Sequence, residues 1–238
     1  MNVLINKNDK ILVVAPHADD ESIGCGGLLS LYGNQADLLL ITDGSKGYTT
    51  HTYSNENDLV QIRSIEFNNA AKLANVKSVF YCNIVDGTVK KSKNKIYQFD
   101  IKNYNYIFVP NRYESHPDHH VLSAYFKSMK RKQKSKAKIF EYEVWTPLRH
   151  PTWYLDITSV ADKKREMIKQ HKSQLKDIDY LTKGMALSCY RGIFIVSEYA
   201  EAFMDARYNE FWGKLYLLLP AKCKSTIKSF LMCKNNSQ

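Results

Sequence analysis

A histidine and three acids follow an apolar run near the N-terminus, in the stretch His17-Ala-Asp-Asp-Glu21. The preceding run, Ile11-Leu-Val-Val14, is rich in β-branched residues and too short for a helix, so it predicts a buried strand. The small residues after Glu21 indicate the start of a helix. The acids therefore lie at the carboxyl end of a strand, where open α/β sheets bind ligands. Leaving so many ionisable groups unpaired there is costly, and a bound cation is the simplest compensation.

A second cluster follows a second apolar run, Tyr106-Ile-Phe-Val-Pro110, which also predicts a buried strand. Pro117 suits the first position of a helix, so His116 is expected at the helix cap and His119 one turn later. The two clusters can meet across the sheet. Two imidazoles and one carboxylate suit a catalytic zinc with an open position for water, and Fe²⁺ or another divalent metal is the alternative. The predicted metal ligands are His17, Asp20 and His119.

These two clusters resemble the motifs of a known family. His17-Ala-Asp-Asp-Glu21 is similar to the His-Pro-Asp-Asp-Glu signature of the PIG-L/LmbE-like zinc N-deacetylases, and His116-Pro-Asp-His119 is similar to their second motif. Ala18 stands where proline is commoner, a change that removes no functional group. The likeness continues to about Leu215 through several shorter segments: Thr42-Asp-Gly44, Arg63, Glu66, Tyr142 to Pro147, His171-Lys-Ser-Gln174, Tyr190-Arg-Gly192 and Ala200-Glu-Ala-Phe203.

The resemblance implies an enzyme that removes an acetyl group from an N-acetylated amino sugar, carried by a glycoconjugate, a nucleotide sugar or a glycolipid. Asp19, between two presumed ligands but turned away from the metal, is the expected general base. His116 is expected to stabilise the oxyanion or to protonate the leaving amine, with Asp118 or another carboxylate orienting its ring. Glu21 and Glu114 are expected to support the site through hydrogen bonds.

Three residues are candidates for substrate contact, and each has a plainer reading. Arg63, three residues before Glu66 on a predicted helix over 58–73, is either a surface ion pair or an anchor of the site. Asp43 opens a glycine-containing loop that lines the pocket or merely turns the chain. Trp145 either stacks on a sugar ring or packs in the core.

Other functions fit the same residues less well. One alternative is a hydrolase of another small amide, which would use the same residues in the same roles. Non-haem iron oxygenases also use two histidines and a carboxylate, but the interval between the first histidine and the acid, three residues here, and the α/β pattern disfavour one. Gly24-Cys-Gly-Gly27 does not match the Gly-x-Gly-x-x-Gly fingerprint of a nucleotide-binding module.

The chain has 238 residues, 44% of them hydrophobic, which is enough for one substantial core. We predict a single-domain Rossmann-like three-layer α/β fold over residues 1–214, with a mostly parallel sheet flanked by helices. A basic amphipathic tail follows over residues 215–238 and is expected to dock on the domain, or else to contact a membrane surface. Five widely spaced cysteines argue against a disulfide framework, and no apolar run has the length of a signal peptide or membrane span. A cytoplasmic protein is expected, while its oligomeric state is left open.

The formal net charge is +10, and much of the excess lies in Lys127 to Lys138, which contains seven basic residues and no acid. A solvated surface is the simplest interpretation. Nucleic-acid binding is not expected, since no binding motif accompanies the charge. The excess favours an anionic small-molecule or glycoconjugate substrate.

The remaining pattern predicts further elements. These are helices from about 117 to 129 and from 160 to 175, an edge strand over 139–145, a strand over 192–196 and a loop with a short strand over 88–100.

Overall fold

The computed structural model describes residues 5–47 and 56–207. The described chain contains seven strands that form a single sheet. They are β1 (Ile11–Ala15), β2 (Ala36–Thr42), β3 (Ser78–Ile84), β4 (Tyr106–Pro110), β5 (Lys138–Tyr142), β6 (Trp153–Asp156) and β7 (Ala200–Asp205).

The strand order is β3-β2-β1-β4-β5-β7-β6. The first five strands pair in parallel, in the 3-2-1-4-5 arrangement of doubly wound sheets, and β7 pairs antiparallel with both β5 and β6. The order reverses between β1 and β4, so the chain leaves these two neighbouring strands in opposite directions. A crevice forms at their carboxyl ends, which is where both histidine clusters lie.

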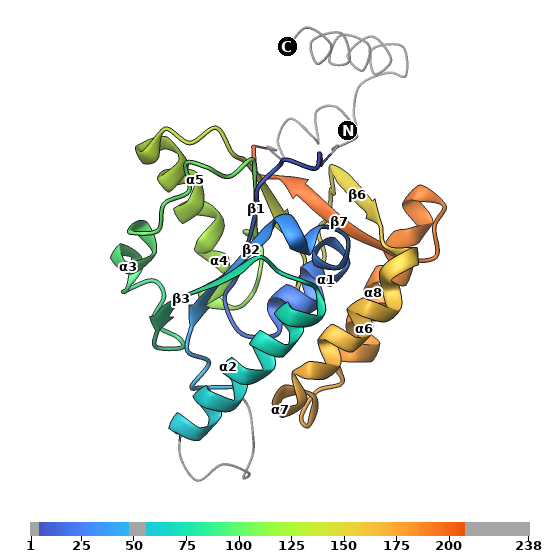
Figure 1. Ribbon diagram of the computed structural model, residues 1–238, viewed down its shortest axis with the longest axis horizontal. Helices are drawn as coiled ribbons and strands as arrows, with labels where there is room; N and C mark the ends of the chain where they lie inside the picture. The colour runs from blue at the N-terminus through green and yellow to red at the C-terminus, as the bar shows by residue number, and fades with distance from the viewer. Residues whose placement is uncertain (1–4, 48–55, 208–238) are drawn as a thin grey trace, which may run out of the picture. The chain divides into compact units, whose positions relative to one another are not determined.

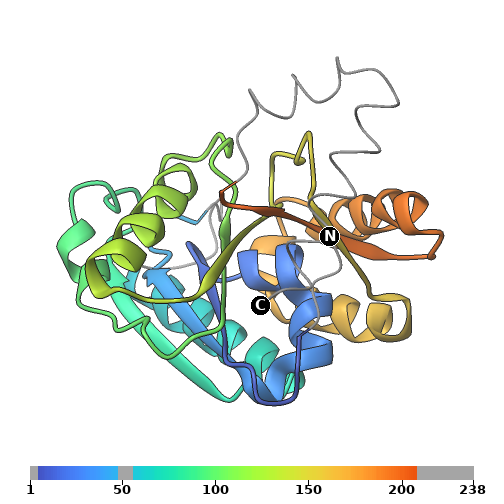
Figure 2. The same cartoon turned by 90° about the horizontal axis from the view of Figure 1, so that it is seen from above.

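Helices cover both faces of the sheet (Figures 1 and 2). The longer helices are α1 (Asp20–Tyr32), α2 (Glu56–Leu73), α5 (Leu122–Gln133), α6 (Ala161–Gln170) and α8 (Tyr180–Gly192). The short ones are α3 (Lys93–Tyr97), α4 (Pro117–His120) and α7 (Lys172–Leu175), with 3-10 turns at Gly33–Gln35, Thr158–Val160 and Ile193–Ile195. Helices α1, α2, α6 and α8 pack on one face, and α3 and α5 pack on the other.

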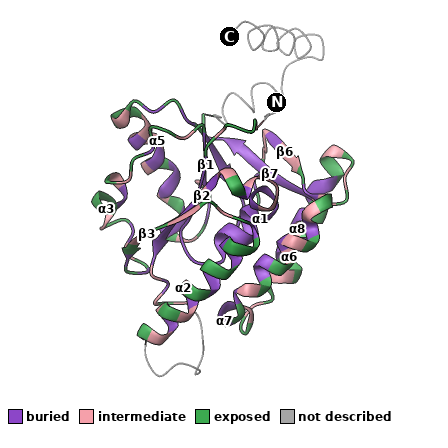
Figure 3. Ribbon diagram, in the orientation of Figure 1, coloured by how far each residue is buried: buried purple, intermediate pink, exposed green. Residues whose placement is uncertain are grey.

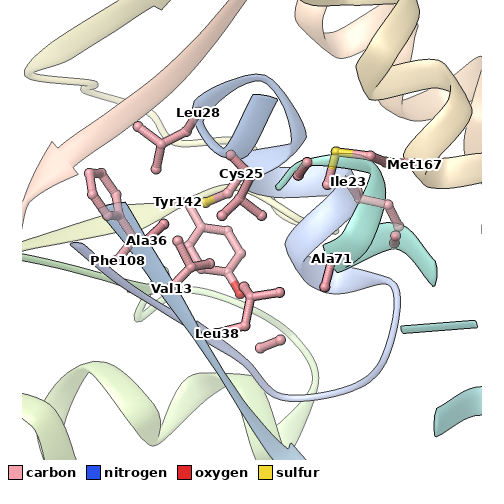
Figure 4. Packing of buried hydrophobic residues seen from close by; sticks show 14 of the residues in the cluster. Val13, Ile23, Cys25, Leu28, Ala36, Leu38, Ala71, Phe108, Tyr142 and Met167 are labelled. Atoms are coloured by element: carbon pink, nitrogen blue, oxygen red, sulfur yellow. The ribbon is translucent and has the colours of Figure 1, made fainter. Parts of the chain in front are cut away.

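The core follows the two-residue period of the strands. In β1, Val13 packs with α1, α2 and α6, whereas Leu12 and Val14 pack on the opposite face with α3 and α5. Figure 4 shows Val13 and Leu38 beside the α1 side chains Cys25 and Leu28. Strands covered on both faces need apolar residues at every position, which explains the continuous run in β1. Figure 3 accordingly shows the central strands buried and the outer side of α2 exposed.

The expected α/β class is confirmed, but several elements differ. Helix α1 begins at Asp20, earlier than expected. Strand β5 is interior rather than an edge, since it pairs with β4 on one side and β7 on the other. Its polar residue Glu141 is buried there in an ion pair with Arg112. The expected strand over 192–196 forms the end of α8 and a 3-10 turn whose Ile193 is 70% exposed. The predicted helix over 160–175 is interrupted at His171.

Two other predicted elements also differ. A short helix, α3, replaces the short strand expected within 88–100. The predicted helix over 117–129 is divided into α4 and α5.

Contacts divide the chain into a unit of residues 1–206 and a second unit of residues 207–238. The predicted tail, residues 215–238, lies outside the described residues, so its docking and its membrane contact stay predictions. Across the described segments, the helices are all too short or too polar to span a bilayer.

Candidate metal centre and active site

The structure brings together the three predicted metal ligands from two adjacent strands. His17 follows β1, Asp20 is the first residue of α1, and His119 lies on α4 just beyond β4. His17 Nδ1 lies 3.1 Å from His119 Nε2, and Asp20 Oδ2 lies 3.3 Å and 3.2 Å from these two nitrogens. All three side chains are buried. Two imidazole nitrogens and a carboxylate oxygen converging on one point fit a divalent metal ion.

Two other groups of potential ligand atoms overlap this set. The ligand atoms of His17, His116 and His119 lie within 4.8 Å of one another, as do those of His17, Asp86 and Asp118. We favour Asp20 as the third ligand because a single oxygen, Oδ2, lies within 3.3 Å of Nδ1 of His17 and of Nε2 of His119.

The pKa values of the clustered side chains are shifted by the close contacts between histidine rings and carboxylates. Burial opposes the charged form of Asp20, but His119 and His17 lower the pKa of its carboxyl far below the usual range. Burial likewise opposes the charged form of His17, yet its contacts with Asp118, Asp20 and Asp86 raise its pKa well above 6.5. A cation is therefore stabilised at this point.

Asp19 occupies the N-cap position of α1 in an unusual backbone conformation. Its φ is 137°, a value that L residues rarely adopt, and its side chain makes no capping hydrogen bond. The carboxylate instead lines a cleft, with Arg63 Nη2 3.8 Å from Oδ1. Burial and the charge of Asp20 raise the pKa of Asp19 to about 7, against the opposing effect of Arg63.

Two carboxylates face the second ring nitrogen of His17. Asp86 Oδ1 lies 3.1 Å and Asp118 Oδ2 lies 3.7 Å from Nε2. Asp118 also accepts hydrogen bonds from the backbone N–H groups of Gly87 and Val89. A carboxylate on the far side of a ligating imidazole fixes the tautomer and the ring orientation. Asp86 is not among the site residues predicted from the sequence.

The prediction for Asp118 needs correction in its detail. We expected its carboxylate to orient the ring of His116. The contact is made instead by the backbone: His116 Nδ1 accepts a hydrogen bond from the N–H of Asp118 at 3.3 Å. The carboxylate of Asp118 faces His17 and the loop after β3.

His116 is the N-cap of α4, with Pro117 at the first helical position as expected. Its half-buried ring lies 4.7 Å from the ring of His17 and 5.0 Å from that of His119, measured between centroids. Burial and the charges of these two histidines lower the pKa of His116. Because Nδ1 accepts a hydrogen bond, the neutral ring carries its proton on Nε2 and can donate it. The adjacent His120 is exposed.

A cleft of about 480 Å³ is lined by His17, Asp19 and Asp20. We call these three residues the floor, together with His119, which contacts His17 and Asp20 but does not itself line the cleft. We call Lys46, Trp145, Asp177 and Tyr180 its rim. Other residues lining the cleft are Gly47, Arg63, Asp86, Gly87, Ser115, His116, Pro117, Gln174 and Ile178.

Of the three residues predicted to contact the substrate, two line the cleft and one does not. Arg63 lines the cleft but is buried, and its guanidinium donates to the carbonyls of Gly44 and Ala18. Trp145 lines the cleft and is 41% exposed. Asp43 is not a lining residue, because its carboxylate accepts hydrogen bonds from the N–H groups of Ser45 and Asp86. Asp43 therefore joins two loops behind the cleft.

The two predicted supporting acids hold parts of the cleft in place. Glu114 is buried and accepts backbone hydrogen bonds from Val144, Trp145 and Thr146 at 3.0 to 3.3 Å. It thereby fixes the segment that carries the rim residue Trp145. Glu21 accepts a hydrogen bond from the N–H of Asp19 at 3.0 Å.

Comparisons with known proteins agree with this geometry. The PIG-L family model, described as GlcNAc-PI de-N-acetylase, matches residues 12–130, a range that contains both histidine motifs. A diacetylchitobiose deacetylase from Thermococcus kodakarensis is 25% identical over 204 residues, which cover 74% of this chain and 74% of that protein.

Solved structures share the fold. The N,N'-diacetylchitobiose deacetylase from Pyrococcus horikoshii matches with a TM-score of 0.70 and 23% identity, covering 83% of this chain and 84% of that one. GalB, the 4-carboxy-2-hydroxymuconate hydratase from Pseudomonas putida KT2440, matches with a TM-score of 0.67 and 19% identity, covering 84% and 97%. The fold therefore accommodates more than one reaction, and the chemistry has to be argued from the site.

Proposed function

The chain belongs to the PIG-L family, and from this membership together with the cleft we propose that it is a metal-dependent hydrolase that removes the acetyl group from an N-acetylated amino sugar. One observation carries the proposal. His17 Nδ1, Asp20 Oδ2 and His119 Nε2 lie 3.1 to 3.3 Å apart at the bottom of a cleft that is also lined by the carboxylate of Asp19.

We propose that His17, Asp20 and His119 hold zinc, with iron(II) as the alternative for the same donors. When bound, the metal lowers the pKa of water and polarises an amide carbonyl by Lewis acidity. Asp86 contributes by holding the ring of His17, so that its Nδ1 faces the other two ligands.

Asp19 is the proposed general base. Its carboxylate faces the cleft and is not used to cap α1, so it can accept a proton from the attacking water and pass it to the leaving nitrogen. Arg63 limits the movement of this carboxylate, because its Nη2 lies 3.8 Å from Oδ1 while the guanidinium is held by two carbonyl groups.

His116 is the proposed hydrogen-bond donor to the oxygen of the acetyl group. Its Nδ1 accepts from a backbone N–H, which leaves the Nε2 proton for the substrate. Donation from a preorganised neutral imidazole stabilises negative charge as it develops on that oxygen. The sugar ring is then placed towards Trp145, whose exposed indole offers a flat apolar face.

The test combines metal analysis with amine release from a panel of N-acetylglucosamine compounds. Wild type is expected to hold about one metal ion per chain and to release both acetate and free amine, since one donor set holds one ion. His119→Ala should lose the metal and the activity together. Asp19→Asn should keep the metal and lose turnover. A wild-type protein that binds no metal after loading contradicts the proposed centre, and one that binds metal but deacetylates no compound on the panel contradicts the proposed reaction.

A further inference from the structure

A buried polar network adjoins the floor residue Asp19. It consists of Glu21, Ser22 and His171, each at most 1% exposed. His171 Nε2 lies 2.9 Å from Glu21 Oε1, the Ser22 hydroxyl donates to the same oxygen at 2.6 Å, and the serine and histidine are 3.1 Å apart. No member of this network lines the cleft.

The network ends at the backbone of Asp19. The second oxygen of Glu21, Oε2, accepts the N–H of Asp19 at 3.0 Å. Asp19 has a φ of 137°, and non-glycine residues in such conformations are strained and persist only where the surrounding structure over-determines them. The carboxylate of Glu21 is thus a direct restraint on the strained residue.

His171 is itself fixed, although it is 150 residues from Glu21 in sequence. It lies at the interruption between α6 and α7. Two residues later, the N–H and hydroxyl of Ser173 donate to Glu66 on α2 at 2.8 Å and 2.6 Å. The same helix α2 carries Arg63, which contacts Asp19 from the other side.

We propose that Glu21 and His171 are positioning residues, which hold the backbone of Asp19 in its strained conformation so that its carboxylate faces the cleft instead of capping α1. The inference rests on the proposed function of Asp19 as general base. The proposal also gives a role to the break between α6 and α7. Because the helix is interrupted at His171, the ring of this histidine can contact Glu21. His171 acts through Glu21 and does not touch the substrate.

The chain offers a matched control, a buried carboxylate that contacts the same helix α1 from another strand. Glu201, on β7, is 3% exposed, accepts the backbone N–H groups of Gly27 and Leu28 at 2.7 and 2.8 Å, and pairs with the buried Lys164 at 2.7 Å. It therefore combines a buried carboxylate, two α1 amides and a buried cation. Its contacts lie in the middle of α1, well beyond Asp19 in sequence, so losing them tests the effect of destabilisation alone.

The experiment compares kcat, KM, metal content and melting temperature for four proteins: wild type, His171→Phe, His171→Gln and Glu201→Gln. His171→Phe is expected to lower kcat by about 100-fold, because a misplaced catalytic group costs about that much. KM and metal content should stay near the wild-type values. His171→Gln, whose amide N–H replaces the Nε2 donor, should recover most of this loss. Glu201→Gln should lower the melting temperature without changing kcat.

The proposal is overturned if His171→Phe loses no more kcat than Glu201→Gln at a similar loss of melting temperature, or if the glutamine variant recovers nothing. If His171→Phe does not fold, Glu21→Gln replaces it in the same comparison. If wild type proves inactive on the whole panel, crystal structures of wild type and His171→Phe decide the question without turnover. An Asp19 that leaves its positive φ in the variant supports the positioning role, and an unchanged Asp19 contradicts it.

Discussion

Each floor residue of the cleft is less than 10% exposed and is held by fixed partners, whereas the rim residue Trp145 is 41% exposed. For example, the carboxylate of Asp20 contacts both the backbone N–H and the ring of His17, and it also contacts the ring of His119. The rim residues Lys46 and Asp177 are exposed and come from connecting segments. The floor is thus held rigidly, whereas the rim is more exposed; on the proposed function, the floor would carry out the chemical step and the rim would contact the part of the substrate attached to the acetamido group.

This contrast predicts different kinetic effects for the two parts. Floor substitutions remove interactions made in the transition state or with the metal, so they should lower kcat or metal affinity. Rim substitutions should change KM with little effect on kcat. Four substitutions test the contrast, in order of decreasing effect.

Asp19→Asn should have the largest effect. The amide keeps the shape of the side chain but cannot accept the proton from water, so kcat should fall by about 10²- to 10⁴-fold. Metal content, measured by atomic absorption, should not change. A variant that keeps a tenth or more of the wild-type kcat would show that another group is the base.

Asp86→Ala tests the support of the floor. It removes the carboxylate that lies 3.1 Å from Nε2 of the floor residue His17. The dissociation constant for the metal, measured by competition with a chelator, should rise by about 10- to 100-fold, as for other residues that orient metal-binding histidines. Asp86→Asn retains an acceptor for the ring N–H and should lose less. Equal affinity in all three proteins would exclude this role for Asp86.

Trp145→Ala tests the rim. Loss of the aromatic face should raise KM by up to about tenfold with kcat nearly unchanged, because aromatic contacts contribute about 0.5–1.5 kcal/mol. Trp145→Phe keeps an aromatic face and should be intermediate. A fall in kcat without a change in KM would mean that Trp145 belongs functionally with the floor.

Lys46→Ala should have the smallest effect. For an anionic substrate, KM should rise about two- to fivefold at low salt and the difference should disappear at high salt, since exposed charge pairs contribute little and are screened. Lys136→Ala removes an equal charge from the basic segment and does not alter the cleft lining, so its KM should match wild type. Equal KM values for both variants at low salt would exclude electrostatic attraction at the rim.

The same contrast explains which parts of the site could be predicted from the sequence. The proposed ligands His17 and Asp20 lie three residues apart after one strand, and the position of His119 beyond the end of a second strand marked it in the same way. Asp86 also follows a strand, but β3 is partly exposed and Asp-Gly is an ordinary turn sequence, so no signal marked it. Tyr180 and Asp177 reach the rim only through tertiary folding of a segment far from both motifs.

The fold shows a similar division. Strands covered on both faces were visible as apolar runs. The interior position of β5 was not, because the alternation of polar Glu141 with apolar Phe140 and Tyr142 is typical of an edge. Glu141 is compatible with burial because it pairs with Arg112 and Lys127 and accepts a hydrogen bond from Ser123. Conversely, the run Ile193 to Val196 is apolar, yet Val196 is 97% exposed with a φ of 58°. Composition alone could not indicate that this segment turns at the surface.

The position of β7 has a consequence for the order of synthesis. β7 is the last strand of the described residues to be synthesised, but it lies between β5 and β6 in the sheet. The first five strands can pair as they leave the ribosome, whereas β5 keeps one unpaired edge until Ala200 to Asp205 emerge. An unpaired strand edge is a template for association with other chains. Translation that stalls before β7 therefore yields a chain that already contains both histidine motifs and still exposes a sheet edge to its neighbours on the polysome.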